Sequence, residues 1–133
     1  MIYENYRLRK TLPKTAAPNL EACCAFFRQF ADRGYSIVHF TISSDMSSTY
    51  QNSVVASREF SNVHVVDTRN LSTGGGLLVV TAGEMLRQGK SVAEIAERCR
   101  VLTAYVDASF VIDSLEFLHK AAAAPRWPCL ART

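Results

Sequence analysis

The sequence lacks the features by which membrane, secreted and metal-stapled proteins are recognised. No apolar run approaches the roughly 20 residues that a membrane span needs. The N-terminal segment MIYENYRLRK is charged and has no apolar core of the kind a signal peptide carries. Cys23, Cys24, Cys99 and Cys129 match no zinc or redox spacing. We therefore expect a cytoplasmic protein with reduced thiols, no transmembrane segment, and no metal or other cofactor.

The sequence also has little net charge. Its formal charge is +3 at pH 7, and two of its 15 basic residues, Arg126 and Arg132, lie in the last 13 positions, which hold no acid. Residues 1–120 are therefore almost neutral. A nucleic-acid-binding domain normally presents a strong basic patch, so we expect no nucleic-acid partner. With 133 residues, of which 48% are hydrophobic, the chain is long enough for one soluble domain with its own core.

Apolar runs alternate with helix-like segments along the chain. The runs SIVHFTI (36–42), NVHVVDT (62–68) and ASFVIDS (108–114) have the composition of strands that are buried on both faces. Asn19 is a candidate helix N-cap, and Ser91 with Glu94 has the spacing of a capping box. Helices are expected over 1–10, 20–34, 48–60, 76–88 and 91–105, and from 115 onward. This alternation predicts an α/β fold, a parallel sheet flanked by helices.

Hydroxyl side chains are concentrated after the first two predicted strands. The segment TISSDMSSTYQNS at 41–53 contains five serines and two threonines, and DTRNLSTGGG at 67–76 follows the second strand. Carboxyl ends of parallel strands meet at the edge where α/β proteins bind ligands, and helix N-termini there favour anions. Serine and threonine are also ordinary helix caps, but one cap uses far fewer hydroxyls. We expect an anionic group held there by uncharged donors rather than by a salt bridge.

Other candidate catalytic or binding residues give weaker signals. His39 and His64 lie inside apolar strands, where a packed strand histidine is the expected role. Asp67 and Asp113 each close a predicted strand and could cap the next helix. The three consecutive glycines at 74–76 lack the following Lys-Ser or Lys-Thr of a phosphate-binding loop, so they predict a turn or a close backbone approach. Nothing in the sequence argues for catalysis.

Four segments, taken in order, resemble the DegV family: LPKTAAPN (12–19), ISSDMSSTYQNS (42–53), VVDTRNLSTGGGLLV (65–79) and FVIDSLEFLHK (110–120). The spacing I-S-S-x-x-S-x-T-Y-Q is the most specific of them. The resemblance implies a partial DegV-like α/β domain over residues 1–120, similar to the N-terminal domain of these proteins and incomplete at both ends. Family members run to roughly twice this length, with an initial Asp-Ser strand and a second domain that this sequence does not contain.

The resemblance also implies a function. DegV proteins bind fatty acids, and several serve as the acyl-carrying subunit of bacterial fatty acid kinase. This chain would then bind a long-chain fatty acid, hold its carboxylate through hydroxyls, and present it to the catalytic subunit of the kinase, without being an enzyme itself. By position, Thr15 and Ser47 would bind the carboxylate, and Ser44 and Thr49 would shape or cap the site.

Three departures from the family pattern affect this expectation. Ala16 stands where many members have serine, and Ser48 replaces the usual glycine. After Lys120 the family continues Gly-Gly-Arg, whereas this chain ends in a non-family tail, AAAAPRWPCLART at 121–133. Alanine codons read one base earlier encode Gly, Arg, Ser or Cys, so a one-base deletion after Lys120 is our hypothesis for the tail. A naturally short chain with a flexible tail is the alternative, and sequencing the gene distinguishes the two.

Two other function classes stay open. The chain could be a small α/β enzyme that acts on an anionic metabolite through Ser47 or Asp67, or an interaction module without a ligand. Replacing Thr15 and Ser47 by alanine in a full-length version distinguishes the three classes. A carrier should lose acyl-phosphate production only when the kinase is present, an enzyme should show turnover alone, and an interaction module should be unaffected. Because an acyl tunnel formed by two domains cannot close with one, we expect weak or no fatty-acid binding by this chain.

Overall fold

The first two predicted strands pair in parallel, as the sequence predicts. In the computed structural model, which describes residues 2–11 and 14–111, β1 (Ile37–Thr41) pairs with β2 (Val63–Asp67). The register places Ile37 opposite Val63 and Thr41 opposite Asp67. Among the described residues the sheet consists of these two strands. Both carboxyl ends therefore meet at one edge of the sheet.

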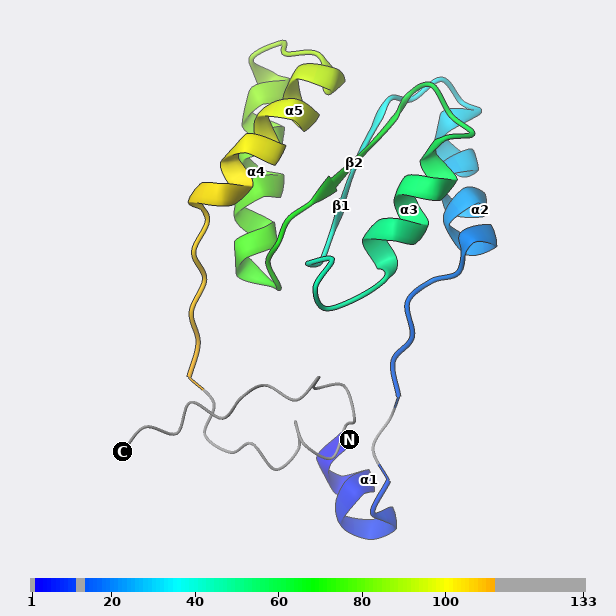
Figure 1. Ribbon diagram of the computed structural model, residues 1–133, viewed down its shortest axis with the longest axis vertical. Helices are drawn as coiled ribbons and strands as arrows, with labels where there is room; N and C mark the ends of the chain where they lie inside the picture. Colours follow the sequence, from blue (N-terminus) through cyan, green and yellow to red (C-terminus); the bar gives the residue numbers. More distant parts are fainter. Residues whose placement is uncertain (1, 12–13, 112–133) are drawn as a thin grey trace. The chain divides into compact units, whose positions relative to one another are not determined.

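Two pairs of helices cover the two faces of this sheet (Figure 1). One face carries α2 (Leu20–Ala31) and α3 (Thr49–Ser57). The other carries α4 (Thr73–Arg87) and α5 (Val92–Leu102), which continues as a short 3₁₀ helix over Thr103–Tyr105. The predicted α/β fold with helices flanking a parallel sheet is confirmed.

Each face of the sheet has its own hydrophobic cluster. Successive strand residues point to opposite faces, so Val65 packs toward one pair of helices and Val66 toward the other. The cluster under α2 and α3 consists of Cys23, Cys24, Phe27, Ala56, Val63 and Val65. The cluster under α4 and α5 consists of Val66, Ala82, Ile95, Ala96 and Cys99. The three cysteines in these clusters are free thiols and are buried.

Local sequence signals fix the ends of two helices as predicted. Asn19 caps α2, because its side-chain oxygen accepts a hydrogen bond from the Ala22 amide at 2.8 Å. Ser91 and Glu94 form a reciprocal capping box at the start of α5, with distances of 3.3 Å and 2.9 Å. Gly34 follows α2 with a φ of 80°, a left-handed conformation that glycine adopts without strain.

The chain divides into two units, and each is described by itself. Ala17–Ser109 contains both strands and α2 to α5. The other unit is formed by Met1–Ala16 and Phe110–Thr133, and its described part includes α1 (Ile2–Arg9), a helix that the sequence predicts. The non-family tail at 121–133 lies outside the described residues, so the tail and its frameshift origin stay predictions.

The third predicted strand is not formed over residues 108–111, the part of it that the structure describes. The outer edge of β2 is already occupied by side chains. The Val65 carbonyl accepts from the Arg100 guanidinium at 3.1 Å, and the Asp67 carbonyl accepts from the Thr103 hydroxyl at 3.3 Å. A further strand therefore has no free carbonyl at these two positions. The remainder of the predicted strand and the helix after it lie outside the described residues.

The glycines at 74–76 lie inside α4, which begins at Thr73 and not at residue 76 as predicted. The interpretation as a turn is wrong, but the close backbone approach is confirmed at Gly74. A Cβ atom added there would lie 2.6 Å from Cγ of Asn70 and would clash with that side chain. At Gly76 it would meet nothing within 4 Å. Asn70 therefore requires a glycine at position 74, in the first turn of the helix.

Candidate functional site

Both hydroxyl-rich turns lie at the carboxyl end of the sheet. The first rim turn, residues 42–48, connects β1 to α3, and the second rim turn, residues 68–72, connects β2 to α4. The Ser43 amide donates to the Asn70 carbonyl at 3.0 Å, and the Thr68 amide donates to the Thr41 carbonyl at 3.2 Å. The two turns therefore lie side by side, as expected for neighbouring parallel strands.

Ser47 and Thr49 form a hydroxyl pair at the start of α3. Their side-chain oxygens are 2.8 Å apart, and both residues are half-buried. The pair carries two hydroxyl hydrogens, and their mutual bond uses one of them. No acceptor for the second is found within the described residues. The pair can therefore donate one hydrogen bond to a ligand without breaking any bond in the protein.

The same pair lies beside the N-terminus of α3. The Thr49 amide donates to the Ser47 hydroxyl at 3.2 Å, whereas Ser48, the N-cap residue, makes no side-chain capping bond. Capping thus describes part of the role of Ser47. Within the part of the chain that the structure describes, the amides of Tyr50 and Gln51 have no hydrogen-bond acceptor. Unpaired amides of this kind favour an anion, which agrees with the site predicted from the sequence.

An arginine that the sequence analysis missed lies beside Ser44. The Arg69 guanidinium donates to the Ser44 hydroxyl at 3.2 Å and forms an ion pair with Asp45 at 2.8 Å. Asp67 accepts hydrogen bonds from the amides of both Ser44 and Arg69, at 3.2 Å and 2.9 Å. Asp67 therefore joins the two rim turns, and the prediction that it caps the next helix is wrong. Its partner in that prediction, Asp113, lies outside the described residues.

Arg69 changes the expected electrostatics of the site only in part. Its charge is opposed by Asp45 and by Asp67, whose carboxylate lies 4.0 Å from it. The donors at Ser47 and Thr49 remain uncharged, as expected. The only sequence signal for this cluster is a basic residue two positions after the aspartate that closes β2, and its pairing depends on the neighbouring turn.

The Thr68 hydroxyl of the second rim turn is used inside the protein. Thr68 is buried, and its hydroxyl donates to the Thr41 carbonyl at 2.8 Å and accepts from the Asn70 amide at 3.3 Å. The Asn70 side chain donates to the Thr68 and Val106 carbonyls at 3.2 Å and 3.3 Å. Thr68 and Asn70 therefore hold the backbone of this turn together, whereas Ser47 and Thr49 keep a donor available.

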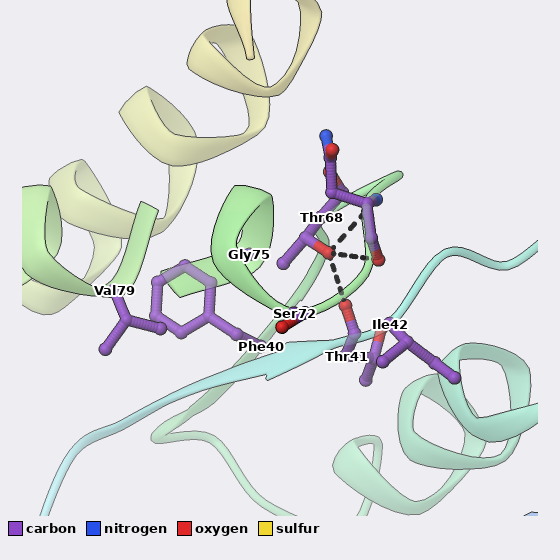
Figure 2. Close-up of a pocket in the computed structure, with 8 residues that line it drawn as sticks. Phe40, Thr41, Ile42, Thr68, Ser72, Gly75 and Val79 are labelled. Atoms are coloured by element: carbon purple, nitrogen blue, oxygen red, sulfur yellow. Dashed lines mark hydrogen bonds between the residues drawn. The ribbon is translucent and has the colours of Figure 1, made fainter. Parts of the chain in front are cut away.

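A small hollow lies between the end of β1, the second rim turn and α4. Figure 2 shows Phe40 and Val79 on one side and the Thr68 hydroxyl, with its bond to Thr41, on the other. The full lining is Phe40, Thr41, Ile42, Thr68, Asn70, Ser72, Gly75 and Val79. Its volume of about 160 Å³ is below the roughly 300 Å³ at which small-molecule sites begin. It is therefore too small to enclose a whole small molecule.

The structure brings together three of the four predicted site residues. Ser44, Ser47 and Thr49 lie on the first rim turn and the start of α3. Thr15 belongs to the unit that includes Met1–Ala16, and its side chain is exposed. Its pairing with Ser47 stays a prediction.

His39 has the packed role predicted for it. Its ring lies edge-on to Phe27, with the ring centroids 5.1 Å apart, and burial lowers its pKa. Within residues 2–11 and 14–111, no group of three or more His, Cys, Asp or Glu side chains could hold a metal ion. Helices in the same ranges are all too short or too polar to cross a bilayer.

Comparison with known proteins gives consistent matches. The model of the family described as "Uncharacterised protein, DegV family" matches residues 1–123. A DegV domain-containing protein of Deinococcus radiodurans is 30% identical over 118 residues, which cover 88% of this chain and 42% of that protein. A fatty acid-binding protein of Thermotoga maritima is 30% identical over 122 residues, covering 89% of this chain and 42% of that protein.

Solved structures agree with the sequence matches. A structure from Thermus thermophilus, described as fatty acid binding of a DegV family protein, superimposes with a TM-score of 0.77 at 29% identity. The superposition covers 91% of this chain and 44% of the Thermus protein. The chain therefore spans less than half the length of the relatives it matches.

Proposed function

Because this chain belongs to the DegV family, we propose that it carries the carboxylate-binding part of a fatty-acid site. The observation that supports this most is the hydroxyl pair of Ser47 and Thr49 beside the N-terminus of α3. It offers one hydroxyl hydrogen, and the α3 amides of Tyr50 and Gln51 offer two more donors. A carboxylate is the lipid group that such donors fit.

The surroundings of the pair suit the rest of the ligand. Ile42 and Met46, on the same rim turn, are 39% and 59% exposed and offer apolar surface next to the hydroxyls. Ser44 and Arg69 would add a polar contact on the other side of the headgroup. Thr15 would complete the site if its segment reaches Ser47, as the family pattern implies.

We further propose that the bound carboxylate is presented to the catalytic subunit of a fatty acid kinase. Hydroxyl and amide donors leave the carboxylate ionised and use only some of its lone pairs. An oxygen that faces solvent can then attack a phosphoryl group of a donor held by the partner, so that the acyl-phosphate O–P bond forms as the bond between phosphorus and the donor's leaving group breaks. This role makes the chain a carrier and implies the cytoplasmic location expected from the sequence.

Binding by the 133-residue chain alone should be weak. A long acyl chain has more than a dozen CH₂ groups, and each contributes about 0.8 kcal/mol when it is buried. The hollow near the rim holds about 160 Å³ and cannot enclose such a chain. The missing contacts would have to come from protein that this chain does not contain.

Titration of the purified chain with stearic acid tests the proposal. We expect a dissociation constant in the micromolar range or weaker, and about a tenfold further weakening by Ser47→Ala, because one headgroup hydrogen bond is lost. Ser57→Ala is the matched control, since Ser57 lies on α3 but its hydroxyl bonds to the Val54 carbonyl. Equal affinity of Ser47→Ala and the unaltered chain would reject the site. A submicromolar dissociation constant for the unaltered chain would contradict only the expectation that this chain binds stearic acid weakly.

A further inference from the structure

Arg69 already holds a carboxylate in a two-point contact at the rim. Its two terminal nitrogens lie 2.8 Å and 3.3 Å from the two carboxylate oxygens of Asp45, and one of them also donates to the Ser44 hydroxyl at 3.2 Å. A guanidinium that meets both oxygens in this way recognises a carboxylate by its shape as well as by its charge. Asp45 therefore shows, within the protein itself, how Arg69 binds an ionised acid.

The two aspartates beside Arg69 are held very differently. The Asp67 side chain is 14% exposed and accepts from the amides of Ser44 and Arg69, so its position is fixed. The Asp45 side chain is 69% exposed, and within the residues that the structure describes it bonds to Arg69 alone. An ion pair between groups this exposed contributes little to stability, because water screens it. Another carboxylate can therefore replace Asp45 at Arg69 at small cost.

The Arg69 guanidinium lies near the hydroxyl pair that the proposed function uses. The first rim turn closes like one turn of a helix, because the amides of Met46 and Ser47 both donate to the Ser43 carbonyl, at 3.0 Å and 3.2 Å. Residues three apart on such a turn lie on one side, with their Cβ atoms about 5–6 Å apart. Ser44, which contacts the guanidinium, and Ser47 have this spacing. A carboxylate bound at Ser47 can therefore turn its second oxygen toward Arg69.

We propose that Arg69 determines the specificity of this site: when a fatty acid binds, the guanidinium exchanges the Asp45 carboxylate for the carboxylate of the ligand. This inference rests on the proposed function, and it names the ligand class as ionised lipids rather than uncharged lipids of the same length. The headgroup gains a salt bridge in addition to the uncharged donors. Asp45 is then a built-in competitor that the ligand displaces, while Asp67 stays in place beside the guanidinium.

Titrations of the 133-residue chain with stearic acid and with octadecanol, at about pH 8 where the acid is ionised, test the exchange. Arg69→Gln should weaken stearic acid binding about fivefold or more, because a charge-assisted contact is lost, and should leave octadecanol binding unchanged. Asp45→Asn should tighten stearic acid binding about two- to fivefold, because the competitor is removed. Opposite signs for the two variants indicate competition, since a purely structural role of the ion pair predicts weaker binding in both.

Two other exposed ion pairs supply matched controls. Arg28 belongs to an ion pair on α2 and its side chain is 56% exposed, close to the 53% of Arg69. Glu97 belongs to one on α5 and its side chain is 71% exposed, close to the 69% of Asp45. Arg28→Gln and Glu97→Gln change the net charge as the test variants do, so neither should alter the affinity for stearic acid. Unchanged far-ultraviolet circular dichroism shows that each variant is folded.

The outcomes distinguish this inference from the proposed function. If Ser47→Ala weakens stearic acid binding but Arg69→Gln does not, the carboxylate site stands and the exchange is overturned. Weaker binding in both Arg69→Gln and Asp45→Asn would also overturn it, as would an equal loss of octadecanol binding in Arg69→Gln. The same shifts in the control variants would assign the effect to net charge and reject the exchange. If neither Ser47→Ala nor Arg69→Gln changes the affinity, the proposed function fails together with this inference.

Discussion

The two rim turns both carry hydroxyl side chains but use them differently. In the second turn, the Thr68 hydroxyl is buried and bonded to the backbone, and Asn70 ties the turn to the end of the 3₁₀ helix. Where the first turn meets α3, Ser47 and Thr49 are half-buried and keep a hydroxyl hydrogen available. Hydroxyl content alone therefore does not identify a binding turn. The distinction depends on whether the protein itself supplies all of the partners.

The largest effect is expected from Thr68→Val. This nearly isosteric change leaves the Asn70 amide without its acceptor and removes the hydroxyl donor to the Thr41 carbonyl, in a site that is 2% exposed. The Thr41 carbonyl keeps its bond from the Thr68 amide, so the Asn70 amide is the group left unsatisfied, and the loss of such a bond lowers the free energy of unfolding by about 1–3 kcal/mol. Urea unfolding measures the loss. Thr81→Val is the control. The Thr81 hydroxyl donates to the Leu77 carbonyl in an exposed bond on α4, so this change should alter stability by about 0.5 kcal/mol at most.

A smaller effect is expected from Gly74→Ala. The added methyl group would displace the Asn70 side chain and loosen its bonds to Thr68 and Val106. The overpacking penalty exceeds the helix-propensity gain of alanine, so a net loss of about 1–2 kcal/mol is expected. Thermal and urea unfolding measure it. Gly76→Ala, with open space at its Cβ, should instead stabilise by about 0.5–1 kcal/mol. The same sign for both variants would contradict the close approach at Gly74.

The smallest effect on stability is expected from Ser47→Ala. The change removes a capping bond to the Thr49 amide at a half-buried position, which is worth about 0.5–1 kcal/mol. The same variant should also weaken carboxylate binding. The expected loss of binding free energy is larger than the expected loss of unfolding free energy. A stability loss equal to that of Thr68→Val would remove the contrast between the two turns. Urea unfolding of both variants under one set of conditions makes the comparison.

Features that depend on neighbouring residues in the sequence were predicted well. Asn19 and the pair Ser91 and Glu94 cap their helices because the bonds span only three residues. The strands β1 and β2 and their burial followed from apolar runs whose length suits a strand covered on both faces.

Features that depend on contacts across the fold were not predicted. Residues 108–111 of the third predicted strand do not form a strand, and Arg100 and Thr103 occupy two carbonyls on the outer edge of β2. No sequence pattern indicated that the side chain of Arg69 would reach the first rim turn. These contacts arise only when segments more than 20 residues apart come together, so periodicity and spacing carry no signal for them.

The division of the buried cysteines between the two clusters has a practical consequence. Cys23 lies on α2 in one cluster and Cys99 lies on α5 in the other, and burial raises the pKa of the Cys99 thiol, which keeps it protonated and slow to alkylate. A thiol reagent therefore reaches each cysteine when its own helical layer opens. Peptide mapping after brief alkylation would report, without any engineered probe, which side of the sheet exchanges with solvent first.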